Sequence, residues 1–158
     1  VIVVRDEQTP LPGAQHPVVV GSDGSAEAKH ALNAAADIAG QWEAPLVVIT
    51  SWMPPPPDPW EHPPFGYRSV AACRQARQEQ AHHTNHESVE HVRTTYNNVQ
   101  VRGLVVEARP EDALMDASPD AAMLALGSKG HGPLMGALLG STARSVLHQS
   151  TKPVMIVH

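Results

Sequence analysis

The chain lacks a second cysteine, a long hydrophobic run and an excess of positive charge, and each absence excludes a class of protein. With one cysteine, Cys73, it cannot form an internal disulfide, which favours a reducing compartment and hence a cytoplasmic protein. No apolar run approaches the roughly 20 residues that a membrane-spanning helix needs. The formal net charge of -5 argues against a nucleic-acid binder, which usually carries a basic face. We therefore expect neither a membrane nor a nucleic-acid partner.

Length and hydrophobic content indicate a single globular domain. The chain has 158 residues, 42% of them hydrophobic, which is enough for one domain with a substantial core. Valine-rich apolar runs, typical of buried parallel strands, alternate with segments of helical pattern. The predicted strands are 18–20, 46–52, 99–106, 121–126 and 153–157. The predicted helices are 26–39, 67–97, a short one beginning at Pro110, and 141–149.

Residue types between these segments support the boundaries. Ser25 is a good N-cap for the first helix, and Gly40 is expected to end it. Residues 53–66 are dense in proline, which predicts a surface loop. The alternation of strands and helices predicts an α/β fold, an open five-stranded and mainly parallel sheet with helices on both faces. In such a sheet, ligands bind outside the carboxyl ends of the strands, where the strand order reverses.

Residues 127–141 follow a predicted strand and are rich in glycine. Glycines let the backbone approach a ligand closely, and the helix that begins at Ser141 offers N–H groups and a positive dipole end to phosphate. Ser141 and Thr142 add hydroxyl donors, and Lys129 or His131 can add positive charge. The plain alternative is a glycine-rich turn that only joins a strand to a helix.

The spacing of these glycines excludes two common phosphate-binding loops. The chain has no G-x-x-x-x-G-K-[ST] pattern, so the loop is not a P-loop. Gly130 and Gly132 are followed by the next glycine at Gly136, one position too late for the dinucleotide fingerprint. The loop also lies near the end of the chain, whereas that fingerprint follows the first strand.

Another pattern does fit this loop. Gly127-x-x-Gly130, then nine residues, then Gly140-Ser141 resembles the G-x-x-G-(nine)-G-[ST] loop of ATP-binding universal stress proteins. The flanking segments agree with the same family. VVVGSDGS at 18–25 is similar to its first strand with its aspartate.

The end of the chain carries the resemblance further. LLGSTARSVLHQSTKPVMIV at 138–157 is similar to the family's last helix and strand, and the resemblance covers roughly 17–158. It implies a Rossmann-like fold of the adenine nucleotide alpha-hydrolase type. It also implies ATP as the ligand, with Mg²⁺ able to join through the phosphates.

The resemblance implies a role for each matching residue. Leu126 and Gly127 would lie against the base and ribose, and Ser51 occupies the place where the family's backbone meets adenine. Asp23 and Ser22 would face the ribose and phosphates, although Asp23 can also be read as a turn residue before the first helix. The phosphate-binding residues that it implies are Gly130, Gly140, Ser141 and Thr142.

The first residues predict a domain boundary. The run VIVV at 1–4 echoes VMIV at 154–157, and relatives often carry two such domains in tandem. Residues 1–16 are therefore interpreted as the trailing strand and linker of a preceding domain, and 17–158 as the universal stress protein domain. Because the family commonly dimerises through its final strands, we expect a homodimer or a tandem pairing there. Pairing of 1–4 with 154–157 would cover an exposed sheet edge.

The long predicted helix carries several histidines. His82 and His86 are spaced to face the same side and to share a zinc ion. A solvated polar face is the preferred interpretation, because polar helical faces usually contact water. We predict no metal site and no catalytic residue.

Three functions compete for this sequence. The leading one is a regulatory ATP-binding stress-response domain that is not a dedicated enzyme, with slow ATP hydrolysis at most. The second is a domain without nucleotide that acts in dimerisation or partner binding. A nucleotidyl transferase or ATP pyrophosphatase is weaker, because neither an SGGxDS-type loop nor a HIGH-like motif is present.

Overall fold

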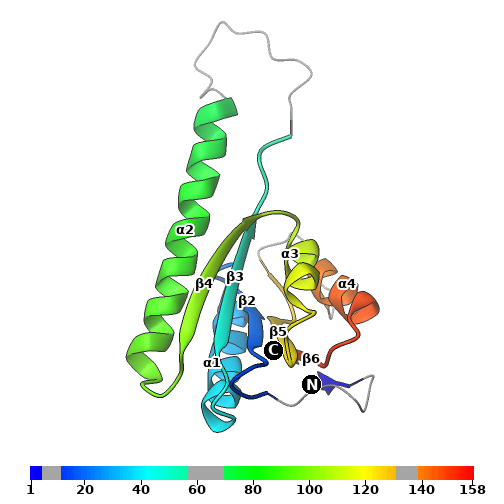
Figure 1. Ribbon diagram of the computed structural model, residues 1–158. Coiled ribbons are helices and arrows are strands. Elements are labelled where there is room, and N and C mark those ends of the chain that lie inside the picture. The colour runs from blue at the N-terminus through cyan, green and yellow to red at the C-terminus, as the bar shows by residue number, and fades with distance from the viewer. Residues whose placement is uncertain (5–11, 57–69, 131–138) are drawn as a thin grey trace, which may run out of the picture.

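The chain forms an α/β fold in which a single sheet lies between two layers of helices (Figure 1). The computed structural model describes residues 1–4, 12–56, 70–130 and 139–158. The strands are β1 (Ile2–Val3), β2 (Val18–Gly21), β3 (Leu46–Trp52), β4 (Val101–Glu107), β5 (Met123–Gly127) and β6 (Val154–Val157). The helices are α1 (Ala26–Gln41), α2 (Val70–Thr95), α3 (Pro110–Ala117) and α4 (Ser141–Gln149). Most of the proline-rich loop and the predicted start of the long helix lie outside the described residues.

The sheet has six strands in the order β1-β6-β5-β2-β3-β4, one more than the sequence predicts. Five strands are parallel, and β1 pairs antiparallel with β6, with Ile2 opposite Met155 and Val3 opposite Val154. The expected pairing of 1–4 with the last strand is therefore present within one chain. The sixth strand is β1, and its pairing covers the edge of β6 that would otherwise be open.

The order of the strands reverses next to β2. The chain runs outward from β2 to β3 and β4, then returns to place β5 on the other side of β2. The carboxyl ends of β2 and β5 are therefore neighbours at the switch point, where a ligand is expected in an open parallel sheet. Those two ends carry the aspartate and glycine segments found in the sequence.

Side chains on β2 alternate between the two helical layers. Val18 and Val20 pack in a core cluster with α1 and α2, whereas Val19 packs in a second cluster with α3 and α4. All three are almost completely buried. Continuous burial explains why this strand is apolar at every position and shows no alternation in its sequence.

Helix α1 does not end at Gly40 as predicted, but continues to Gln41. A Cβ on Gly40 would lie 3.0 Å from Asn98 Nδ2, so this glycine permits a close approach of the turn before β4. The reversal after the helix is made at Glu43, whose φ of 51° is left-handed. The glycine is thus explained by packing against a distant segment.

The buried stripe of helix α2 includes the polar residues Thr84, Asn85 and Ser88, and the helix extends past the carboxyl ends of the strands at its beginning (Figure 1). In the buried part, Asn85 Nδ2 donates to the carbonyl oxygens of Val48, at 3.0 Å, and Leu104, at 3.3 Å. Its side chain occupies the space that a Cβ on Gly103 would need. Among the described helices, none is apolar enough over sufficient length to cross a membrane.

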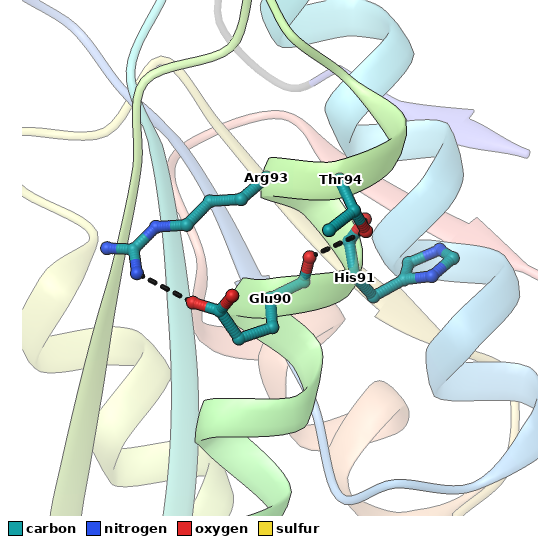
Figure 2. A network of polar contacts seen from close by, with 4 residues as sticks. All are labelled: Glu90, His91, Arg93 and Thr94. Carbon is teal, nitrogen blue, oxygen red and sulfur yellow. Dashed lines mark hydrogen bonds and ion pairs between the residues drawn. The ribbon is translucent and has the colours of Figure 1, made fainter.

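One side of the last turns of α2 is a solvated polar face, whereas Val89 and Val92 on the other side are buried. Figure 2 shows Arg93 donating to the Glu90 carboxylate, at 2.8 Å, and the Thr94 hydroxyl donating to the Glu90 carbonyl, at 2.8 Å. His91 Nε2 lies 2.7 Å from Asn33 Oδ1 on α1, which ties the two helices together. Over the described residues, no group of three or more His, Cys, Asp or Glu side chains could hold a metal ion.

Candidate functional site

A pocket of about 350 Å³ lies at the carboxyl ends of β2 and β5. It brings together every binding residue predicted from the sequence, from four separate parts of the chain. These are Ser22, Asp23, Ser51, Leu126, Gly127, Gly130, Gly140, Ser141 and Thr142. The volume is within the range of about 300–1,000 Å³ for small-molecule sites.

The carboxylate of Asp23 is positioned between α1 and the glycine loop. Its Oδ1 accepts hydrogen bonds from the backbone N–H of Ser25, at 3.0 Å, and from the Ser25 hydroxyl, at 2.6 Å. Its Oδ2 lies 2.5 Å from the point that a Cβ on Gly130 would occupy. Asp23 therefore makes the turn before α1, which confirms that interpretation, and it also lines the pocket, where its contact with ribose and phosphates stays a prediction.

Gly24 and Ser25 complete that turn. Gly24 has a φ of +83°, which a residue with a side chain rarely adopts. Ser25 is the N-cap of α1, as predicted, and its Oγ accepts from the Ala28 N–H at 3.2 Å. The start of α1 is thus capped from within the chain.

The start of α4 is arranged differently. Its N-cap is Gly140, which has no side chain with which to cap the first N–H groups. Ser141, Thr142 and Ala143 form the first turn and line the pocket. The N–H groups and dipole of a helix start favour a phosphate or another anion.

The glycine loop is closed at its base by backbone hydrogen bonds. The Gly140 N–H donates to the Ser128 carbonyl at 2.7 Å, and the Ser128 N–H donates to the Val157 carbonyl at 2.7 Å. Ser128 itself is buried. The end of β5 and the start of α4 are therefore held side by side. Lys129 lines the pocket beside them, whereas His131 lies outside the described residues.

Gly127 has a reason to be glycine that the sequence did not reveal. A Cβ here would lie 2.8 Å from the carbonyl carbon of Glu27 and 3.0 Å from the nitrogen of Ala28. The first turn of α1 therefore packs directly on the end of β5. Gly127 lines the pocket, and its lack of a side chain serves the packing of the helix on the strand.

The hydroxyl of Ser22 is hydrogen-bonded to α2. Its Oγ lies 2.9 Å from Ser88 Oγ, and Ser88 Oγ donates to the Thr84 carbonyl at 2.9 Å. Either hydroxyl can donate in the Ser22–Ser88 pair, and Ser22 is the donor when Ser88 donates to Thr84. A contact of this hydroxyl with a ligand stays a prediction, since the structure shows it bound to α2.

Part of the pocket lining is apolar. Ile49 on β3, Leu126 on β5, and Pro110 and Leu114 on α3 line it next to Ser51. Sequence reasoning identified Leu126 and Ser51 but missed the other three. Ile49 could have been found, because it lies two residues before Ser51 and shares its face of the strand. No sequence signal locates α3 over the sheet at this point.

The comparison with family models decides the family. The model described as the Universal stress protein family matches residues 15–158. This chain belongs to the universal stress protein family. The matched residues include the described residues that line the pocket.

A curated relative shows the same kinship. The universal stress protein Rv2005c of Mycobacterium tuberculosis is 31% identical over 157 residues, which cover 99% of this chain and 50% of that protein. The chain thus spans about half the length of the curated relatives it matches.

Solved universal stress proteins share the fold. The protein UspA from Lactobacillus plantarum superposes with a TM-score of 0.74 at 17% identity, covering 92% of this chain and 99% of that chain. A crystal structure of a universal stress protein in complex with cAMP superposes with a TM-score of 0.65 at 26% identity, covering 92% and 98%.

Proposed function

We propose that this universal stress protein domain binds an adenine nucleotide, with ATP as the expected ligand, and acts as a regulatory stress-response module. The observation that supports this most is the convergence of nine sequence-predicted residues on one pocket at the switch point of the sheet. The related protein that forms a complex with cAMP supports the same class of ligand.

The two ends of the pocket suit the two halves of a nucleotide. Ile49, Leu114 and Leu126 offer apolar surface to a flat base, beside the backbone of Ser51. The start of α4 offers N–H groups and the Thr142 hydroxyl to phosphate. A nucleotide oriented in this way would span the pocket.

Mg²⁺ fits the phosphate end of this arrangement. The Asp23 carboxylate lines the pocket facing the glycine loop, and the hydroxyls of Ser141 and Thr142 lie on the helix start. Carboxylate, hydroxyl and phosphate oxygens are the hard ligands that Mg²⁺ prefers. These three side chains would hold the ion together with the phosphates.

The proposed role is regulatory. Among the described residues that line the pocket, Asp23 is the only carboxylate, and there is no histidine. Because Asp23 is expected to hold Mg²⁺ at the phosphates, this set contains no second group that could act as a general base. Hydrolysis of bound ATP is expected to be slow at most.

We propose, in addition, that the last strand, β6, is the edge through which the domain pairs, either with the trailing strand of a preceding domain or with a second copy of the chain. Residues 1–16 would be the trailing strand and linker of a preceding domain, and 17–158 the universal stress protein domain. The pairing of β1 with β6 and the double length of the curated relatives support this arrangement. In a chain without such a strand, β6 would be available to a second copy.

Calorimetry with Mg-ATP tests the nucleotide proposal. Any nucleotide bound to the purified chain is first removed and identified. The chain and its Gly130→Ala and Asp23→Ala variants are then titrated with Mg-ATP. We expect binding to the parent chain and weaker binding to both variants. Gly13→Ala is the matched control, because a Cβ there meets nothing within 4 Å.

Two results would overturn this proposal. Absence of nucleotide binding by the parent chain would favour the alternative of a dimerisation or partner-binding domain without nucleotide. Binding that is indifferent to both pocket variants would locate the nucleotide elsewhere. Circular dichroism and thermal unfolding establish that each variant is folded before its affinity is compared.

A further inference from the structure

A second cavity of about 370 Å³ adjoins the candidate nucleotide pocket. Asp23 and Ser51 line both cavities, so these two residues form the boundary between them. The second cavity lies between the end of β3 and the middle turns of α2. The family resemblance and the sequence motifs assign no role to its other residues.

The lining of this second cavity combines an aromatic wall with hydrogen-bonding side chains. Trp52 and Met53, at the end of β3, supply the apolar surface. Arg77 and Gln80, on α2, supply a guanidinium and a carboxamide. Arg77 Nη1 donates to the Met53 carbonyl at 3.1 Å, which holds that side chain across the cavity wall.

This chemistry suits a flat ring with hydrogen-bond donors and acceptors on its edge. An aromatic side chain can stack on any nucleobase. Glutamine and arginine side chains can each form a pair of hydrogen bonds with the edge of a purine. A long aliphatic ligand would make no use of the polar atoms of Gln80 and Arg77 beyond their existing bonds to Thr84 and the Met53 carbonyl. A second nucleobase therefore fits this cavity best.

We propose that the second cavity binds the second nucleoside of a dinucleotide whose first nucleotide occupies the site proposed above. The inference rests on the proposed function, since it needs a nucleotide in the first pocket. Each cavity alone is at the lower end of the range for small-molecule sites, and the two share a boundary. One ligand can therefore extend through both cavities. Its phosphates would then lie near the Asp23 carboxylate, and Mg²⁺ or Lys129 would have to offset the repulsion between these negative charges.

The test compares a dinucleotide with mononucleotides on the whole chain. Diadenosine tetraphosphate, ATP and AMP are titrated by calorimetry in the presence of Mg²⁺, against the parent and the Gln80→Ala and Arg77→Ala variants. Gln75→Ala is the matched control, because Gln75 bonds Glu79 on the same helix and does not line the cavity.

We expect the dinucleotide to bind the parent about tenfold more tightly than ATP, because the second base would stack on Trp52 and depend on Gln80 and Arg77 for its hydrogen bonds. Gln80→Ala and Arg77→Ala should remove most of that gain and leave the affinities for ATP and AMP unchanged. Gln75→Ala should leave all three affinities unchanged.

Two outcomes would overturn the proposal. Equal affinities for diadenosine tetraphosphate and ATP would show that the second cavity takes no base. A gain that survives both variants would show that the second nucleoside binds elsewhere. If the parent chain binds ATP normally, either outcome leaves the proposed function intact. If the parent chain binds none of the three nucleotides, the proposed function itself is refuted.

Discussion

The carboxylate of Asp23 occupies the space beside Gly130 that a side chain would need. The distance from Asp23 Oδ2 to an ideal Cβ on Gly130 is 2.5 Å, shorter than real Cβ contacts allow. The two residues follow different strands, β2 and β5, and meet because these strands are neighbours. The aspartate and the glycine of the two motifs are therefore one structural unit.

A double-mutant cycle tests this unit. Gly130→Ala should displace the Asp23 carboxylate. It should therefore lower Mg-ATP affinity by at least most of the loss that Asp23→Ala causes. In the double variant the added methyl group has room, and we expect the two losses to be non-additive by about 1 kcal/mol or more. Calorimetry on the four proteins measures the coupling. Strictly additive losses would show that the two residues act independently.

Ser88 is expected to position the loop that carries Asp23. Ser88→Ala removes the hydrogen-bond partner of the buried Ser22 hydroxyl and should lower the free energy of unfolding by about 1–3 kcal/mol. It should also weaken Mg-ATP binding, because Asp23 follows Ser22 directly. Denaturant unfolding and calorimetry provide the two measurements.

The control for Ser88 is Thr94→Ala, which removes an exposed hydrogen bond from the same helix far from the loop. It should leave Mg-ATP affinity unchanged. In an Asp23→Ala background, Ser88→Ala should cause no further loss of affinity. A further loss of the same size would mean that Ser88 does not act through Asp23.

Gly127→Ala should destabilise the fold. The added methyl group would meet the backbone of Glu27 and Ala28, which cannot move without shifting the start of α1. Overpacking of this kind costs about 1–3 kcal/mol of the free energy of unfolding. Urea unfolding of this variant beside Gly13→Ala, where the methyl group meets nothing, isolates the steric effect. Equal stability of the two variants would contradict the packing interpretation.

Deletion of residues 1–4 should uncover the edge of β6. The N–H of Ile156 donates to the Val1 carbonyl at 2.8 Å, and the Ile156 carbonyl accepts from the Val1 N-terminus at 2.8 Å. The deletion would leave both backbone groups of Ile156 without these partners. Unpaired strand edges associate with other strands, so we expect concentration-dependent self-association. Sedimentation velocity over a range of concentrations measures it. A shortened chain with the same sedimentation behaviour as the parent would show that β1 does not protect this edge.

Much of the fold follows from local patterns. The valine runs of β2 and β3, Pro110 at the start of α3 and the N-cap Ser25 lie where the sequence predicts them. Each of these depends on a few consecutive residues, whose backbone preferences act over short range. Alternation of strands with helices then implies the parallel sheet and its switch point.

Other features depend on contacts between distant segments and could not be read in this way. Gly40 is inside α1 because the turn at Asn98 approaches it, and the Asn85 side chain fills the space beside Gly103. Leu114 lines the pocket because α3 packs across β2 and β3. A glycine looks the same in a sequence whether it ends a helix or admits a neighbour.

The sequence by itself determined the family, the strand and helix segments, and the loop pattern with its aspartate, because each is encoded in consecutive residues. Tertiary structure decided which atoms those residues meet. It directed the Ser22 hydroxyl to Ser88, packed α1 on Gly127 and placed Asp23 against Gly130. The physical reason is that close packing and hydrogen bonds join residues by position in space, and only the folded sheet brings the ends of β2 and β5 together.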